Sequence, residues 1–194
     1  HPWPVKVANR LHALCTPGNN EIDRMGEMDQ MVAIHFAGAV RALLAKTGHH
    51  PSQVRAIGSH GQTIRHRPEL GFTLQIGNGA RLAVETGIDV ICDFRAKDIA
   101  LGGQGAPLVP AFHQAVFASS QNMRMILNIG GIANVSVLPG PDDQVFGFDT
   151  GPGNTLLDQW YRKHKGGNYD PKGSWAASGW VNTELLSRLL GHPY

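Results

Sequence analysis

Apolar residues recur with helical spacing at the start of this chain and with strand-like spacing further along. Apolar side chains return every three or four positions over residues 4–15 and 21–46, which predicts one short and one long helix. Thr16-Pro17-Gly18 ends the first pattern, and Thr47-Gly48 ends the second. The beginning of the chain is therefore predicted to be helical.

Further along, short β-favouring runs are separated by glycine-rich turns and by shorter helical patterns. The runs predict strands at residues 54–57, 72–76, 88–92, 125–129, 135–138 and 145–148. The helical patterns predict helices at residues 80–85 and 110–118, after Asn154, and at 182–190. This alternation indicates an α/β fold in which the long early helices pack over mixed sheets.

Composition is typical of a globular protein with an apolar core. Of the 194 residues, 42% are hydrophobic and 16% are charged, and the formal net charge is only +2. The lysines and arginines are scattered, which argues against a nucleic-acid partner. No apolar run is long enough to span a bilayer and no signal-peptide pattern opens the chain, so we expect no membrane partner. Cys15 and Cys92 lie far apart, which favours reduced thiols and a cytoplasmic protein.

The ends of the chain and its histidines lead to two further expectations. The chain begins without Met at His1 and stops at Tyr194, and neither end resembles a natural terminus. We therefore expect a fragment of a longer protein. We expect no protein-held metal site, because the His49-His50 pair has no carboxylate or thiol at ligand spacing.

Residues 125–154 combine three predicted strands with two glycine-rich turns, and the last strand is predicted to end at Asp149. The turn that follows, Thr150-Gly151-Pro152-Gly153-Asn154, suits close approach of a ligand because glycines leave room for one. Its backbone N–H groups, with those that start the next helix, suit phosphate oxygens. A carboxylate in this place suits removal of a proton from a hydroxyl or a water molecule. An ordinary Asp-Thr-Gly hairpin turn is the alternative interpretation.

A second loop, residues 58–63, carries candidate sugar-binding residues. His60, Gln62 and Thr63 lie among small residues, and all three side chains can bond sugar hydroxyls. A turn without any ligand is the alternative interpretation.

A third loop, residues 93–108, contains two carboxylates, two cations and three glycines. Arg95 and Lys97 suit an anionic substrate, and Arg binds one with a fixed fork of donors. A solvated loop with weak local ion pairs is the alternative interpretation.

Five segments in unbroken order resemble anhydro-N-acetylmuramic acid kinase, a bacterial enzyme family of cell-wall recycling. They are AIGSHGQTIRH (residues 56–66), LQIGNG (74–79), DFRAKDIALGGQGAPLVPAFH (93–113), LNIGGIANVS (127–136) and GFDTGPGN (147–154). The GGQGAPLVPAFH and GFDTGPGN motifs together are highly specific, whereas GSHGQT alone is weak. The resemblance covers nearly the whole chain and implies an actin-like (ribonuclease-H-like) sugar-kinase fold that is incomplete here.

The resemblance implies a kinase that uses ATP and Mg²⁺ in a coupled reaction. Such enzymes hydrolyse the internal 1,6-anhydro bond of the sugar while the ATP γ-phosphate moves to its 6-oxygen, which gives N-acetylmuramic acid 6-phosphate. By this resemblance Asp149 is the general base that takes a proton from the water attacking the anomeric carbon. Positioning and electrostatic stabilisation supply most of the rate in phosphoryl transfer.

The resemblance also implies roles for residues of the other loops. The expected phosphate side consists of Gly130, Gly131, Asn134, Gly151, Gly153 and Asn154. The expected sugar side consists of His60, Gln62, Thr63, Asn78, Arg95 and Lys97. Family members commonly carry further arginines after the first, and this chain has Ala96 and Lys97 there. Lys97 supplies charge without a bidentate fork.

The domain organisation is also an expectation from the resemblance. Residues 1–124 are expected to form mostly the substrate side and residues 125–194 the phosphate side, with the N- and C-terminal parts of the family missing. The fragment alone is then expected to be inactive, and a homodimer is expected for the longer protein. Two other functions remain as alternatives: another actin-like kinase of a sugar or small acid, and a non-catalytic sugar-binding remnant.

Overall fold

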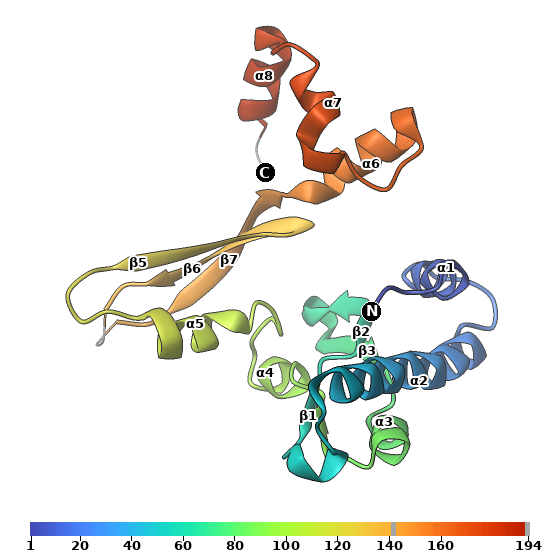
Figure 1. Ribbon diagram of the computed structural model, residues 1–194. Coiled ribbons are helices and arrows are strands. Elements are labelled where there is room, and N and C mark those ends of the chain that lie inside the picture. Colours follow the sequence, from blue (N-terminus) through green and yellow to red (C-terminus); the bar gives the residue numbers. More distant parts are fainter. Residues whose placement is uncertain (141–142, 193–194) are drawn as a thin grey trace. The chain divides into compact units, whose positions relative to one another are not determined.

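The computed structural model describes residues 1–140 and 143–192, and the chain divides into two compact units, His1–Ala106 and Pro107–Tyr194 (Figure 1). Both units combine helices with small sheets, so the chain has the α/β character that the sequence predicts. None of the helices in the described residues is long and apolar enough to cross a membrane.

Two helices open the first unit, as predicted. α1 (Val5–Leu14) begins directly after Pro4, a residue with a fixed φ that favours a helix start. α2 (Glu21–Thr47) ends at Gly48, which adopts φ +69° and donates its N–H to the Leu44 carbonyl. A glycine in this left-handed conformation is a common way to end a helix, because it has no Cβ to clash.

The main core of the first unit forms where α1 and α2 meet a hairpin. β2 (Gln62–Arg67) and β3 (Phe72–Ile76) pair in antiparallel fashion, and both helices contact the hairpin. The buried apolar side chains of this core are Val7, Leu11, Leu14, Met28, Val32, Ile64 and Ile76. Those on the helices recur at spacings of three or four residues, which confirms the helical pattern of the sequence.

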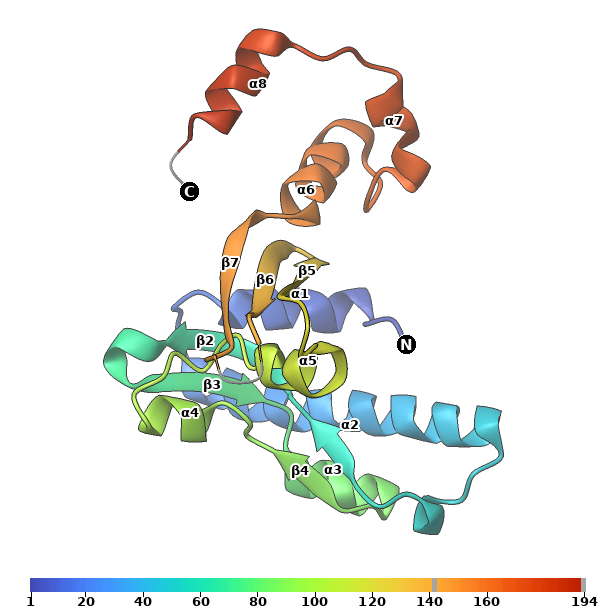
Figure 2. The same cartoon turned by 90° about the vertical axis from the view of Figure 1, so that its left-hand side faces the viewer.

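A second, smaller sheet completes the first unit. β1 (Ile57–Ser59) pairs in parallel with β4 (Val90–Cys92), and α3 (Gly79–Thr86) precedes β4 and packs against α2 (Figure 2). α4 (Ala96–Ala100) follows β4 and contacts β3. These elements bring the ends of β1 and β4 close to the start of α3.

The second unit is built on one antiparallel sheet. Its strands β5 (Arg124–Ile129), β6 (Ile132–Leu138) and β7 (Phe146–Pro152) lie in that order (Figure 1). The β5–β6 connection is the tight Gly130-Gly131 turn that the sequence predicts. A hairpin with so short a connection fixes the pairing of its two strands.

Helices flank this sheet in the sequence. Their bounds are α5 (Val109–Phe117), α6 (Asn154–Lys165), α7 (Ser174–Ala177) and α8 (Thr183–Leu190). α5 packs on β6. α8 begins as predicted at Asn182, whose side-chain oxygen accepts the Leu185 N–H at 3.0 Å. Single 3₁₀ turns occur at Pro51–Gln53, Pro68–Leu70 and Pro171–Gly173.

Several element boundaries differ from the sequence prediction, because the length of a strand depends on how far it pairs with its neighbour. The strand predicted at residues 54–57 begins only at Ile57, where pairing with β4 starts. The loop predicted at residues 58–63 contains the end of β1 and the start of β2. The loop predicted at residues 93–108 contains α4. β7 continues to Pro152, because the first residues of β6 pair with it there.

The contact between α2 and α3 depends on Leu82, which is 1% exposed and packs against Ala33 and Ala37. We expect Leu82→Ala to lower the free energy of unfolding by about 2–5 kcal/mol, because it removes buried methyl groups and leaves a cavity. Leu43→Ala removes the same atoms from a side chain that is 60% exposed. It should change the free energy of unfolding by less than about 0.5 kcal/mol. Urea unfolding followed by circular dichroism measures both, and equal effects would contradict this packing.

Candidate active site

Asp149 lies within β7, on one face of the three-stranded sheet, and not at the end of a strand as the sequence predicts. Asn134 of β6 is directly opposite Asp149, and Asn128 of β5 is directly opposite Asn134. Directly opposite residues of antiparallel strands share a face, so these three polar side chains form a row across the sheet. Asn128 was not predicted as a site residue; only the pairing of the strands identifies it.

Thr150 is an extra residue in β7, directly after Asp149. Asn134 pairs with Asp149 and Ala133 pairs with Gly151, so Thr150 has no residue opposite it. Such a β-bulge bends the strand and changes the direction of nearby side chains. The Thr150 hydroxyl donates to the Ala133 carbonyl at 3.2 Å, and Gly151 adopts φ +144°. The bulge therefore fixes the backbone from which the Asp149 carboxylate projects.

The Asp149 carboxylate is open to solvent. The residue is exposed, and within residues 1–140 and 143–192 it takes part in no ion pair. α5 covers the neighbouring part of the same sheet face, where His113 Nδ1 lies 2.8 Å from the buried Ser136 Oγ. The part of the face at Asp149 stays accessible, so this carboxylate can reach a water molecule and accept its proton.

The two glycine-rich turns near Asp149 are bonded to each other. Gly153 donates its N–H to the Gly131 carbonyl, and Asn154 donates its N–H to the Gly130 carbonyl, both at 2.8 Å. A Cβ atom on Gly153 would collide with the Gly130 carbonyl oxygen, and one on Gly131 would lie 2.7 Å from Thr155 Oγ1. Glycine is therefore required at Gly153 by the close approach of the two turns, whereas a side chain at Gly131 would first have to displace the Thr155 hydroxyl.

These bonds limit how the turns can serve as a phosphate site. The N–H groups of Gly153 and Asn154, which the sequence assigns to phosphate oxygens, already donate to carbonyls. The first N–H groups of a helix are the ones that usually bind an anion. Gly130 and Gly131 form the tip of the hairpin, and Asn134 lies on the face of Asp149. The phosphate-binding roles of these residues stay predictions.

The first unit holds a small polar cavity of about 150 Å³, lined by residues of the predicted sugar side. His60 and Asn78 line it together with Ser59, Asp29 and Asp93. The buried Ser59 hydroxyl has no hydrogen-bond partner among the described residues, and Asp93 adopts φ +60°. An unpaired buried hydroxyl and a residue in an uncommon backbone conformation are both features of binding sites.

Asp29 of α2 holds one wall of this cavity and was not predicted from the sequence. Its carboxylate accepts the Gly77 N–H at 2.8 Å and the Asn78 side-chain N–H at 2.9 Å. The Asn78 side-chain oxygen in turn accepts the Arg81 N–H at 2.8 Å and caps α3. The N–H group and the oxygen of the Asn78 side chain thus both form hydrogen bonds within the protein. Asp29 is one of four acids in the first nine residues of α2, and the helical pattern gave no signal of its role.

The other predicted sugar-side residues of β2 point in different directions. Gln62 and Thr63 are neighbours on a strand, and successive side chains of a strand lie on opposite faces. The Thr63 hydroxyl accepts a hydrogen bond from the Gln75 side chain at 3.2 Å. The predicted loop would have presented both residues to one ligand, whereas the strand presents one on each face.

Arg95 and Lys97, the predicted anion-binding cations, lie in different surroundings. Arg95 is half-buried, and its Nε donates to His60 Nε2 at 2.9 Å. Lys97 is exposed on α4 and forms no ion pair in the described part of the chain. The first unit therefore brings together His60 and Arg95, and the second unit brings together Asp149 and Asn134.

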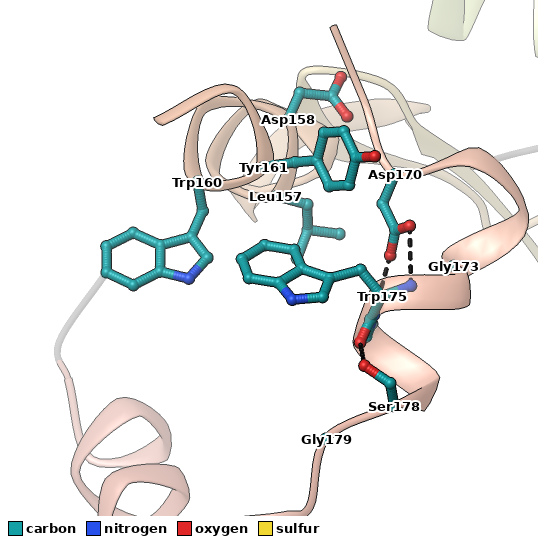
Figure 3. A pocket seen from close by; sticks show the side chains of 10 residues that line it. Leu157, Asp158, Trp160, Tyr161, Asp170, Gly173, Trp175, Ser178 and Gly179 are labelled. Atoms are coloured by element: carbon teal, nitrogen blue, oxygen red, sulfur yellow. Dashed lines mark hydrogen bonds between the residues drawn. The ribbon is translucent and has the colours of Figure 1, made fainter. Parts of the chain in front are cut away.

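A larger cavity, about 670 Å³, lies between α6 and α7 and was not predicted (Figure 3). Leu157, Trp160, Tyr161 and Trp175 supply its apolar walls. The Tyr161 and Trp175 rings meet edge to face, with centroids 5.6 Å apart. The aromatic residues of α6 thus border this cavity together with the Trp175 ring of α7.

Asp170 at the edge of this cavity anchors α7 (Figure 3). Its carboxylate accepts the Trp175 N–H at 3.0 Å and the Ala176 N–H at 2.9 Å. The bonds from Ala176, Trp175 and Ser174 lower the pKa of Asp170 below its ordinary value of 3.8. These bonds favour the charged carboxylate, which is the form that accepts them.

We expect Asp170 to stabilise the folded chain in a pH-dependent way. Because its pKa is lower in the folded chain, the stabilisation is present above pH 3.8 and is lost as the pH falls through the lowered pKa. Asp170→Asn should lower the urea midpoint near neutral pH, and this difference should shrink in acid below pH 3.8. Tryptophan fluorescence measures the midpoint. Asp158→Asn, at the same cavity, serves as the control, and a difference that persists unchanged in acid would contradict the role.

Comparison with known proteins identifies the family of this chain. The family model described as anhydro-N-acetylmuramic acid kinase matches residues 1–194. Proteins with that name from Shewanella oneidensis and Shewanella woodyi are 58% and 59% identical to the chain over 193 residues. Each alignment covers 98% of this chain and 52% of the relative, so the chain spans about half the length of these curated relatives. This chain therefore belongs to the anhydro-N-acetylmuramic acid kinase family.

Proposed function

We propose that the protein carrying this chain is an ATP-dependent kinase of anhydro-N-acetylmuramic acid. In this proposal it hydrolyses the 1,6-anhydro bond and phosphorylates the 6-oxygen, which gives N-acetylmuramic acid 6-phosphate. The relatives from Shewanella bear the name of this activity. The activity is proposed for the longer protein, since the chain spans about half the length of those relatives. The expected inactivity of the 194-residue chain alone stays a prediction.

The observation that carries the proposal is the exposed carboxylate of Asp149. It lies on a sheet face beside Asn134 and directly before a β-bulge, so a rigid strand and not a mobile loop positions it. In the proposed reaction Asp149 accepts a proton from the water molecule that attacks the anomeric carbon. The Asn134 side-chain amide is placed to orient that water, because an amide offers both a donor and an acceptor.

The residues near Asp149 fit a phosphate-bearing substrate in part. A Cβ atom on Gly130 would meet only the Ile132 carbonyl oxygen at 3.8 Å, so the space beside this residue of the turn is open and a phosphate group can approach its backbone. No group of three or more His, Cys, Asp or Glu in the described residues is placed to hold a metal ion. In kinase sites Mg²⁺ is commonly bound through one or two carboxylates together with the substrate phosphates. When bound, ATP supplies the phosphoryl group and Mg²⁺ offsets its charge.

The first unit supplies the anion-binding group in this proposal. Arg95 is half-buried and forms no ion pair among the described residues. Its guanidinium offers two parallel donors that match a carboxylate, such as the lactyl carboxylate of muramic acid. Lys97 adds positive charge nearby in the sequence without such a fork.

The proposal also covers the fold, the oligomeric state and the location expected of the family. We propose an actin-like arrangement for the longer protein, a homodimeric state and a cytoplasmic location. The small sheets flanked by helices in both units are compatible with the first of these.

We expect Asp149→Asn in the longer enzyme to abolish turnover while leaving substrate binding nearly intact. Loss of a general base lowers the rate by about 10²–10⁴-fold, whereas Asn keeps the shape of the side chain. Asp89→Asn, at an exposed acid of the first unit, is the control and should leave turnover unchanged. Release of ADP measures turnover and calorimetry measures binding. Normal turnover in Asp149→Asn would refute the assignment.

We expect the oxygen of solvent water to enter the product at the anomeric carbon. In H₂¹⁸O the label should appear on carbon 1, because water attacks there, while the sugar keeps its own 6-oxygen. Mass spectrometry of fragments locates the label. Unlabelled product incubated in H₂¹⁸O corrects for exchange at the anomeric hydroxyl. Absence of label above that background would point to a different sugar kinase.

A further inference from the structure

His60 lies between two groups that fix the position of its proton. Its Nδ1 is 3.0 Å from the Gly61 carbonyl oxygen, and its Nε2 is 2.9 Å from Nε of Arg95. A carbonyl oxygen can only accept a hydrogen bond, and a guanidinium can only donate one. Both contacts are therefore satisfied together only by the neutral imidazole with its proton on Nδ1.

This arrangement decides which edge of Arg95 remains available. Nε of Arg95 donates to His60, which leaves the two terminal nitrogens for another acceptor. These form no ion pair with any acid in the described part of the chain. A guanidinium binds a carboxylate best when its planar fork is already oriented. His60 thus acts on Arg95 as a fixed support.

The surroundings of His60 contain few other charged groups. The cavity that His60 lines is bordered by Asp29 of α2 and by Cys92 and Asp93 at the end of β4. The Asp29 carboxylate accepts hydrogen bonds from Gly77 and Asn78 and is thus engaged by other groups. Among the described residues, Arg95 is the cation in hydrogen-bond contact with the imidazole.

We propose that His60 is a positioning residue that orients Arg95 toward the carboxylate of the substrate, and that protonation of His60 releases Arg95. A protonated imidazole carries hydrogen on both nitrogens, so Nε2 can no longer accept from Arg95. Two facing cations also repel each other. This role replaces the direct contact with sugar hydroxyls that the sequence predicts for His60. The inference rests on the proposed function, because that function supplies the carboxylate.

The state of the imidazole can be tested on the 194-residue chain without any activity. In the chain labelled with ¹⁵N-histidine, two-bond ¹H–¹⁵N correlation spectra distinguish the two neutral forms of each ring. We expect His60 to carry its proton on Nδ1 near neutral pH. Arg95→Met should weaken this preference, because only the Gly61 carbonyl then favours it, and should shift His60 toward the pattern of His49, an exposed histidine in a loop. A native His60 with the same pattern as His49 would overturn the inference.

The effect on recognition can be tested with matched substrates in the longer enzyme. We compare the anhydro sugar with its lactyl methyl ester, which lacks the negative charge. His60→Leu should raise KM for the acid by at least about tenfold, because the supporting hydrogen bond to a charged group is lost, with a smaller change for the ester. His60→Gln keeps an acceptor near the position of Nε2 and should restore most of the affinity. His49→Gln is the control.

The pH dependence separates positioning from a merely structural role. When the medium is made acidic, KM for the acid should rise in the native enzyme, because a protonated imidazole cannot accept from Arg95. It should not rise in this way for His60→Gln or for the ester. An equal rise in KM for the acid and the ester in His60→Leu would overturn the inference. So would a pH profile of His60→Gln that is the same as that of the native enzyme. A native enzyme that ignores the anhydro sugar would instead refute the proposed function, and the spectra would still decide the His60–Arg95 contact.

Discussion

Two backbone hydrogen bonds tie the end of β7 in the second unit to the turn between β5 and β6. Gly153 and Asn154 donate to the carbonyls of Gly131 and Gly130, and this link sets where β7 ends and α6 begins. The glycines permit it, because a Cβ atom on Gly153 would strike the Gly130 carbonyl oxygen. The glycine-rich segment at Gly153, which was predicted from the sequence to bind phosphate, thus also connects β7 to the turn between β5 and β6. Its glycines serve the close approach of two chain segments.

Carboxylates play two different parts in this chain. Asp29, Asp98 and Asp170 each accept backbone N–H groups and hold a turn or a helix start in place. Such bonds fix the side chain in place, and at Asp170 they also lower the pKa of the carboxyl. Asp149 differs from them, because it is exposed on a sheet face and lies next to Asn134 across the strands. This contrast supports Asp149 as the acid that is available for chemistry.

The sequence predicted most elements of the fold but fewer details of the site. Helical spacing identified α1 and α2, but it only partly identified their buried faces. Leu11 and Val32 lie in the core, whereas Val5, Ile22 and Leu43 of the same pattern are exposed. The strand limits around Asp149 were missed, since the pairing of β6 with β7 extends the strand beyond the apolar run. Asn128 and Asp29 were missed for a similar reason. Their roles arise from residues opposite in a sheet or distant in the chain, and local composition carries no trace of them.

The β-bulge at Thr150 also limits how the length of this segment can vary during evolution. Asp149 is fixed by pairing with Asn134, and Asn154 is fixed by its bond to the Gly130 carbonyl. Thr150 is the extra residue that lets β7 satisfy both of these contacts. Removal or insertion of one residue would either rotate the carboxylate to the opposite face of the sheet or pull the start of α6 off the hairpin. The number of residues between Asp149 and Asn154 is therefore constrained more strictly than the identity of every side chain between them.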